Sequence, residues 1–177
     1  MHSTREVATV RLTTTEAGVL ALLAIEGERS GYDLTKAVDR AIGHIWSPAK
    51  SGLYATLPRL AKERLAHKRG RLYRISTAGR AALDEWLTTV EPGARETFFL
   101  KLFVGGLTTT DVLLRHVEQF RADVEEQLEM YRQIERTNSN RGHDWYHRHM
   151  LRHALERSEQ EIAWADGVAR ALRRGPR

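Results

Sequence analysis

The chain has 177 residues, 41% of them hydrophobic, and carries 28 Lys and Arg against 23 Asp and Glu. It has no cysteine, which excludes disulfides, thiolate metal sites and cysteine nucleophiles. The polar N-terminus lacks the apolar core of a signal peptide, and no run approaches the roughly 18 apolar residues of a membrane span, so we expect a cytoplasmic protein without a membrane partner.

The positive charge is concentrated in the first half of the chain. Residues 1–90 carry 14 Lys and Arg against 9 Asp and Glu, whereas residues 91–177 carry 14 of each. The stretch between residues 47 and 80 contains nine Lys and Arg but only one acidic residue, Glu63, which gives it a net charge of +8. A folded surface of that charge attracts polyphosphate, so we expect the first half to bind double-stranded DNA.

The chain begins with three predicted helices. Thr13 and Glu16 form a T-x-x-E capping box at the start of the first. Residues 30–43 form the second, which opens with the capping sequence Ser-Gly-Tyr-Asp and ends at a glycine. The third begins between Pro48 and Ser51, because a proline disfavours helix at the residue before it.

The third helix has an apolar face and a polar face. Leu53, Leu57 and Leu60 fall within about 60° of one another at 100° per residue and predict the buried face. The opposite face carries Ser51, Ala55, Pro58 and Lys62, flanked by Tyr54 and Arg59. A proline inside a straight helix costs about 3 kcal/mol, so we expect the helix either to kink at Pro58 or to start later.

Residues 65–75 are predicted to form two short strands around a tight Arg69-Gly70 turn, in which Gly70 supplies a positive φ. A fourth helix follows from Ser76 or Thr77. Three helices followed by a two-stranded ribbon are the order of a winged helix-turn-helix. A Glu-Pro-Gly sequence at residues 91–93 is the expected boundary, so we predict a winged helix-turn-helix DNA-binding domain over residues 1–90.

Residues 94–177 are predicted to form an all-helical, coiled-coil-like domain. A short apolar helix ends near Gly105, and a long helix capped by Thr108 and Asp111 carries apolar residues at three- and four-residue steps. A last helix covers about residues 144–172. Long amphipathic helices with little else to cover them need a partner, so we expect a homodimer. The predicted dimerisation residues are Phe99, Leu102, Phe103, Val117, Phe120, Val124, Leu128, Tyr131, Leu155, Ile162 and Leu172.

Five motifs follow one another between residues 12 and 87. They are Leu12-Thr13-x-Thr15-Glu16, Ser30-Gly31-Tyr32-Asp33-Leu34, Trp46-Ser47-Pro48, Leu53-Tyr54-x-x-Leu57-x-Arg59-Leu60 and Tyr73-x-Ile75-Ser76-x-Ala78-Gly79-Arg80. Together they resemble the PadR family of bacterial transcriptional regulators, and Leu100-Lys101-Leu102-Phe103 with Trp164 resembles the C-terminal domain of its longer branch. The resemblance implies a homodimer that binds a pseudo-palindromic operator, usually represses, and is released by a small ligand or a stress signal.

The candidate DNA contacts lie on three predicted elements. The third helix would read base edges in the major groove, the ribbon would contact phosphate or the minor groove, and the second helix would clamp the backbone. The candidates are Tyr32, Lys36, Lys50, Ser51, Tyr54, Arg59, Lys62, Lys68, Arg69, Arg71 and Arg74. The simpler alternatives are a solvated basic helix face, cations that protect an edge strand, and a Tyr32 that packs on Trp46.

Two further groups of side chains could bind small partners. The histidines form two i, i+4 pairs, a spacing that can chelate a metal ion, but nearby arginines would repel a cation, so we expect no metal and no cofactor. These histidines are His143, His147, His149 and His153. Aromatic side chains could line a pocket for a small aromatic effector, although helical spacing more often marks core. The candidates are Trp86, Phe98, Trp145 and Trp164.

The sequence contains no dinucleotide-binding, Walker, nucleophile-elbow or zinc-protease motif, so we expect no enzyme. The leading hypothesis is a sequence-specific transcriptional regulator, a ligand- or stress-responsive repressor that acts as a homodimer. The alternatives are a winged-helix interaction module that does not bind DNA directly and a histidine-based metal sensor.

Overall fold

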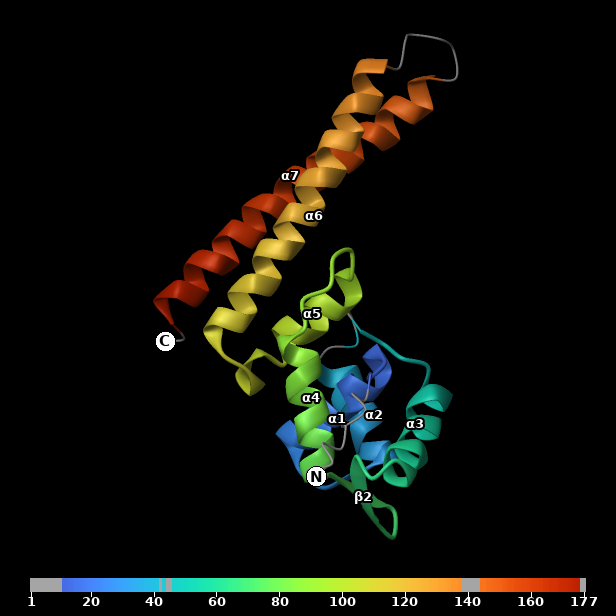
Figure 1. The fold of residues 1–177 in the computed structure, drawn as a ribbon. Coiled ribbons are helices and arrows are strands. Elements are labelled where there is room, and N and C mark those ends of the chain that lie inside the picture. The colour runs from blue at the N-terminus through green and yellow to red at the C-terminus, as the bar shows by residue number, and fades with distance from the viewer. Residues whose placement is uncertain (1–10, 42, 44–45, 138–143, 176–177) are drawn as a thin grey trace, which may run out of the picture. The chain divides into compact units, whose positions relative to one another are not determined.

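The computed structural model describes residues 11–41, 43, 46–137 and 144–175. The fold is mainly helical, as predicted, with one small antiparallel sheet (Figure 1). The elements are α1 (Thr14–Glu26), β1 (Arg29–Ser30), α2 (Gly31–Ala41), α3 (Lys50–Lys62), β2 (Ala66–Arg69), β3 (Leu72–Ile75), α4 (Thr77–Thr88), α5 (Arg95–Phe103), the short 3-10 helix η1 (Gly105–Leu107), α6 (Thr110–Thr137) and α7 (Asp144–Arg174).

The chain forms two compact units. The N-terminal unit holds the residues up to Thr89 together with Phe99–Thr108, and the C-terminal unit holds Val90–Phe98 and the residues from Thr109 onward. The sequence predicts one boundary, at residues 91–93. The structure differs from this prediction, because residues 99–108 return to the N-terminal unit. That return divides α5 between the two units.

The predicted capping box at the start of α1 is confirmed. The Glu16 carboxylate accepts hydrogen bonds from the Thr13 N–H and hydroxyl, both at 2.8 Å, and the Thr13 hydroxyl accepts the Glu16 N–H at 3.3 Å. These contacts satisfy N–H groups that the first turn of a helix leaves open. They also hold the Glu16 side chain, which is only 9% exposed, in one position.

The capped start of α2 is also confirmed. The Asp33 carboxylate accepts the Ser30 hydroxyl at 2.6 Å and the Ser30 N–H at 3.2 Å. The side-chain hydrogen bond, followed by the backbone one, holds the pKa of Asp33 below its ordinary value. Ser30 belongs as well to β1, a two-residue strand that the sequence does not predict.

α3 begins at Lys50, as predicted, and continues through Pro58 to Lys62. The expectation of a later start is therefore wrong. Leu53, Leu57 and Leu60 are at most 2% exposed, which confirms the predicted buried face. Pro58 lies on the exposed face, so its ring meets solvent rather than the core.

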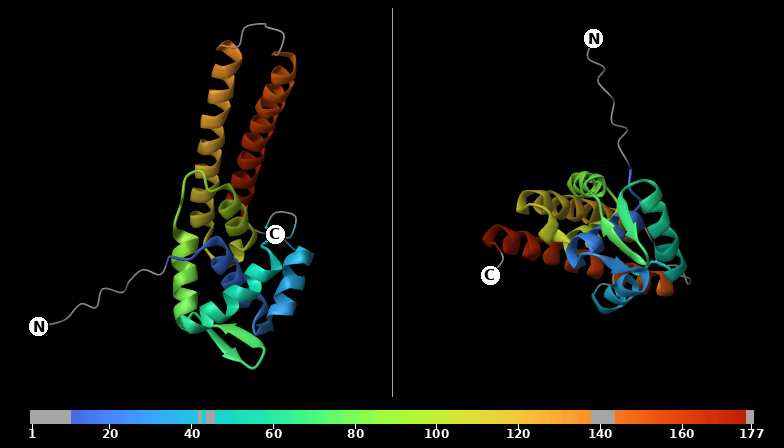
Figure 2. Two further views of the ribbon diagram at one scale, coloured as in Figure 1. Left: turned by 90° about the vertical axis from the view of Figure 1, so that its right-hand side faces the viewer. Right: turned by 90° about the horizontal axis from the view of Figure 1, so that it is seen from below.

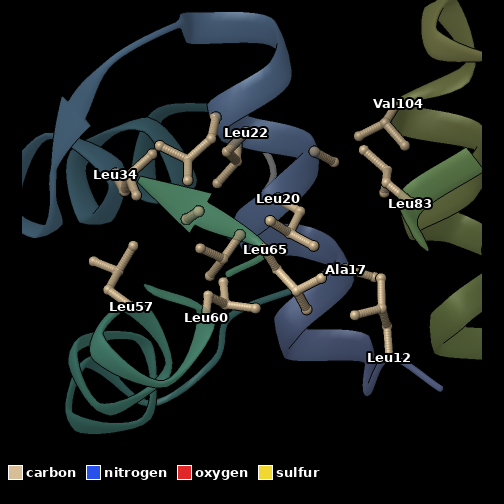
Figure 3. Close-up of a cluster of buried hydrophobic side chains, with 14 of the residues drawn as sticks. Leu12, Ala17, Leu20, Leu22, Leu34, Leu57, Leu60, Leu65, Leu83 and Val104 are labelled. Atoms are coloured by element: carbon tan, nitrogen blue, oxygen red, sulfur yellow. The ribbon is translucent and has the colours of Figure 1, made fainter. Parts of the chain in front are cut away.

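The core of the N-terminal unit is built around α1. Side chains of α1, α3 and α4 converge on Leu20, with Leu60 and Leu83 among them (Figure 3). Leu100 and Val104 of residues 99–108 belong to the same cluster. The other buried members are Leu12, Ala17, Val19, Ala21, Leu22, Leu23, Leu34, Val38, Trp46, Leu53, Leu57, Leu65, Ala66, Tyr73, Ala82 and Leu87.

The predicted ribbon is present, but its turn is shifted by one residue. The turn is Gly70-Arg71, not Arg69-Gly70, because Arg69 still pairs with Leu72. Gly70 has the predicted positive φ, +60°. β1 adds a third strand beside β3 in the order β1-β3-β2. α4 then starts at Thr77, capped by the Ser76 hydroxyl, as expected.

Lys101 ties residues 99–108 to the end of α4. Its Nζ donates to the Thr89 carbonyl at 2.5 Å and lies 4.6 Å from the centre of the Trp86 ring. The side chain is 2% exposed, so the buried charge is stabilised by a carbonyl and an aromatic face. This contact helps to explain why the segment packs with the N-terminal unit.

α6 and α7 lie side by side as two long antiparallel helices (Figures 1 and 2). The predicted cap of α6 at Thr108 is wrong by one residue, because the Thr109 hydroxyl accepts the Val112 N–H. The predicted apolar stripe of α6 packs against α7 of the same chain. No helix in the described part of the chain is long and apolar enough to span a membrane.

Candidate nucleic-acid interface

The exposed side of α3 presents polar groups and cations above the leucine face. The exposed side chains are Lys50, Ser51, Tyr54, Ala55, Pro58, Arg59 and Lys62. The N-cap residue, Ala49, makes no side-chain hydrogen bond to the first turn. Backbone N–H groups at this helix start therefore remain available to an acceptor such as a phosphate oxygen.

Tyr54 lies on the flank of α3 that faces the start of α2. A Cβ placed on Gly31 would come within 2.7 Å of the Tyr54 ring and 3.1 Å of Leu57. Glycine at this position therefore lets the Tyr54 ring lie against the first turn of α2. The ring is 47% exposed, so one side of it contacts protein and the other faces solvent.

Tyr32 stays on the surface rather than packing on Trp46. It is 58% exposed, and the Lys36 ammonium lies 4.5 Å from its ring centre. Trp46 is buried instead, against Gly18 of α1, where a Cβ would lie 2.4 Å from its ring. Tyr32 and Lys36 thus remain together at the surface, at the start of α2.

A hollow of about 770 Å³ connects α2, α3 and the ribbon. Tyr32 and Tyr54 line it from the two helices, and Lys68, Arg69 and Arg71 line it from the ribbon. Five of the eleven sequence-predicted contacts therefore surround one concave surface. Its walls combine aromatic faces with positive charge, the combination that nucleic acid favours.

The strand register places the ribbon cations on two faces. Lys68 pairs with the buried Tyr73, and its ammonium lies 5.8 Å from the centre of that ring. Arg69 and Arg74 lie on the other face, because neighbours along a strand point to opposite sides. Arg71 belongs to neither face, since it occupies the turn. Arg69 and Arg71 therefore do not share a strand face.

Three of the candidate cations already have carboxylate partners. Arg59 contacts Glu16 of the capping box at 2.9 Å, and Arg69 contacts a carboxylate before β1, that of Glu28, at 2.8 Å. Lys50 lies 3.9 Å from Asp39 at the end of α2. The candidate cations that form no ion pair within the described residues are Lys36, Lys62, Lys68, Arg71 and Arg74.

Arg74 is set apart from the hollow. It lines a second depression of about 440 Å³ with His67 of β2 and Arg80 of α4. Arg59 is also set apart, because it reaches toward α1 on the flank of α3 opposite Tyr54. Sequence reasoning missed Gly31, Glu16 and Glu28 because each acts across elements that are distant in the sequence.

The predicted dimerisation residues differ in exposure. Val117, Phe120, Val124 and Leu128 are buried within the single chain. Phe99, Leu102, Tyr131, Leu155, Ile162 and Leu172 are half-buried, and Phe103 is 42% exposed. The exposed large apolar side chains of the C-terminal unit are Met130, Trp145, Tyr146, Met150 and Trp164.

The four effector candidates belong to three separate groups. Phe98 stacks on Phe120 at 4.4 Å, and Trp164 meets both rings edge-on. Trp145 lies with Tyr146 and His149 at the start of α7. The remaining candidate, Trp86, is covered by Lys101 in the N-terminal unit.

Among the described residues, no three His, Asp or Glu side chains are arranged to hold a metal ion. His147, His149 and His153 lie exposed on α7. His143 lies outside the described residues.

The three-helix order, the capped start of α4 and the antiparallel ribbon define a winged helix-turn-helix protein with an added helical unit. Residues 19–85 match the transcriptional regulator PadR-like family, and residues 94–173 match the virulence activator alpha C-terminal family. The chain belongs to the PadR-like family of DNA-binding transcriptional regulators. This assignment confirms the expected family and the expectation of a regulator rather than an enzyme.

Two relatives align over most of the chain. A probable transcriptional regulator of Mycobacterium tuberculosis is 29% identical, over 83% of this chain and 92% of that protein. The negative transcriptional regulator PadR of Bacillus subtilis is 25% identical, over 85% of this chain and 92% of its own length.

Solved structures of other proteins also align with the chain. A crystal structure of the Bacillus protein covers 90% of this chain and 99% of that one, with a TM-score of 0.44 at 23% identity. That protein has also been solved with operator DNA and with p-coumaric acid. The Vibrio cholerae virulence activator AphA covers 91% and 99%, with a TM-score of 0.40 at 24% identity.

Proposed function

We propose that the chain is a sequence-specific repressor that acts in the cytoplasm as a homodimer and responds to a small effector. Residues 1–90 would bind DNA, and residues 94–177 would supply the dimer contact and the effector site. The observation that carries the proposal is the hollow in which Tyr32, Tyr54 and three ribbon cations meet beside the exposed face of α3. The Bacillus relative is a negative regulator, which supports repression.

The contacts divide into base readers and phosphate contacts. Lys50, Ser51 and Tyr54 lie in the first turns of α3, the part of a recognition helix that enters the major groove first. Their hydroxyl and ammonium groups can donate to base edges. Lys68 and Arg71 lie on the ribbon without carboxylate partners among the described residues and would meet phosphate. Arg59 and Arg69 would contribute less, because each contacts a carboxylate within 2.9 Å, whereas Lys50 lies 3.9 Å from Asp39.

The experiment is a binding series on operator DNA selected from random fragments and on a scrambled duplex. Tyr54→Ala is expected to reduce the preference for the operator over the scrambled duplex by about 2- to 13-fold, the range for one hydrogen bond of about 0.5–1.5 kcal/mol. Tyr54→Phe keeps the ring and removes the hydroxyl, so it separates packing against Gly31 from hydrogen bonding. Arg71→Ala is expected to weaken binding to the operator and to the scrambled duplex by the same factor. Equal losses from Tyr54→Ala and Arg71→Ala on both duplexes would contradict this division of roles.

The dimer would use apolar side chains that the C-terminal unit leaves exposed. Tyr146 and Met150 are 72% and 68% exposed on α7, away from the stripe that packs on α6. Exposed apolar patches commonly mark interaction sites. Light scattering is expected to give twice the chain mass for the wild type and a lower mass for Met150→Glu with unchanged helicity. A monomeric wild type that still binds a full palindrome tightly would refute the dimer.

The effector would stack on the Phe98, Phe120 and Trp164 cluster. Trp164 is 40% exposed, so one side of this cluster is reachable from solvent. Flat rings favour stacked or edge-on contacts with aromatic side chains. We expect p-coumaric acid, used as a probe, to raise the melting temperature of the wild type and not that of Trp164→Ala. Equal shifts in both proteins would place the ligand elsewhere.

A further inference from the structure

The ribbon carries a carboxylate contact that crosses all three strands. Arg69 of β2 donates from Nη2 to Oε2 of Glu28 at 2.8 Å, although the two residues are 41 positions apart. Glu28 directly precedes β1, and β1 pairs with β3 through Arg29 with Tyr73 and Ser30 with Leu72. This short strand therefore holds Glu28 beside the sheet face that carries Arg69.

The two arginines near the ribbon tip consequently differ in charge balance. Arg71 forms no ion pair within the described residues, whereas the charge of Arg69 is balanced by Glu28. The Arg69 side chain is 80% exposed and that of Glu28 is 30% exposed, so the pair lies at the surface that would meet DNA. A phosphate must compete with the carboxylate for the same guanidinium N–H group.

We infer that Glu28 is a positioning residue that withholds Arg69 from DNA phosphate. The inference rests on the proposed contact between the ribbon and DNA. Each cation that neutralises a phosphate releases condensed counterions, which sets both affinity and salt dependence. Glu28 removes one such cation from each winged helix-turn-helix unit of the dimer, called a head below. The paired arginine then contributes little to binding, and the grip on any DNA sequence is weaker than the number of cations implies.

The test measures the affinity of the full-length chain for a scrambled duplex by fluorescence anisotropy at several salt concentrations. Glu28→Gln keeps the size of the side chain and frees Arg69. We expect the slope of log affinity against log salt to steepen by about 0.9 for each head that binds, which at 0.1 M salt is about an eightfold gain in affinity for one head and about 60-fold for two. Arg69→Ala should change the wild type little and should abolish the gain in the Glu28→Gln background.

Two controls separate this inference from its alternatives. Glu85→Gln removes the same charge from α4, so an equal gain there would show that net charge alone is responsible and would overturn the inference. Arg71→Ala should make the slope shallower by about 0.9 for each head. If it does and Glu28→Gln has no effect or weakens binding, the positioning role is wrong while the ribbon contact stands. If neither substitution changes the slope, the ribbon does not contact DNA and both proposals fail.

Discussion

Gly79 lies in the first turn of α4, where the helix crosses the base of the ribbon. A Cβ on Gly79 would lie 2.0 Å from the Leu65 carbonyl oxygen and 2.9 Å from its carbon. Both are backbone atoms, so no rotamer change relieves the clash. The same carbonyl accepts the Ser76 N–H at 3.0 Å, and the Ser76 hydroxyl caps α4 through the Gly79 N–H at 2.9 Å. A shift of α4 would therefore disturb both hydrogen bonds.

Gly79→Ala should consequently destabilise the protein, although alanine is the better helix former by about 1 kcal/mol. Overpacking costs about 1–3 kcal/mol, and each weakened hydrogen bond costs about 0.5–1.5 kcal/mol. After subtraction of the gain in helix propensity, these terms give a net loss of about 1–5 kcal/mol in the free energy of unfolding.

Urea denaturation followed by circular dichroism measures this loss. The matched control is Gly167→Ala in α7, where the nearest atom to a new Cβ is the end of the Arg170 side chain at 3.9 Å. That substitution should stabilise by about 0.5–1 kcal/mol. A Gly79→Ala protein as stable as the wild type would refute the packing described for α4 and the ribbon.

Three further predictions concern the surface that would read DNA. Gly31→Ala should push the Tyr54 ring from its place and reduce sequence preference in binding assays, while the unfolding free energy changes by less than about 1 kcal/mol because the ring is half exposed. The pKa of Asp33 is lowered in the folded state, so the contribution of this carboxylate to stability is complete above the unfolded pKa and is lost as the pH falls through the lower folded value. In an NMR titration of Ser30→Ala, the pKa of Asp33 should rise toward its ordinary value. Arg59→Ala should lower stability by about 1 kcal/mol in denaturation, through loss of a half-exposed ion pair to the start of α1, and should leave the salt slope of DNA binding nearly unchanged.

Local signals in the sequence are sufficient to predict where most of the first helices begin. Within one turn, Thr13 forms hydrogen bonds with Glu16, and Ser30 forms them with Asp33. The capping roles of these residues are therefore predictable from spacing alone. The cap of α6 shows the limit of this reasoning. Three consecutive threonines, at residues 108–110, offer the same hydroxyl, and the 3-10 helix before them selects the middle one.

Contacts between distant residues could not be predicted in the same way. β1 has only two residues and no alternating pattern, and it exists because β3 offers an open edge. The partners of Arg59 and Arg69 are 43 and 41 residues away in the sequence, and nothing local points to them. The stripe on α6 predicts a partner helix, but its spacing is the same for a second chain as for α7 of its own chain.

Amide hydrogen exchange of the full-length chain, with and without operator DNA, tests most directly whether α3 and the ribbon meet the duplex together. We predict that DNA slows exchange at the start of α3, residues 50–54, and at the ribbon turn, residues 69–72, in the same complex. Slowing confined to the basic, aromatic start of α7, with α3 and the ribbon unchanged, would contradict it.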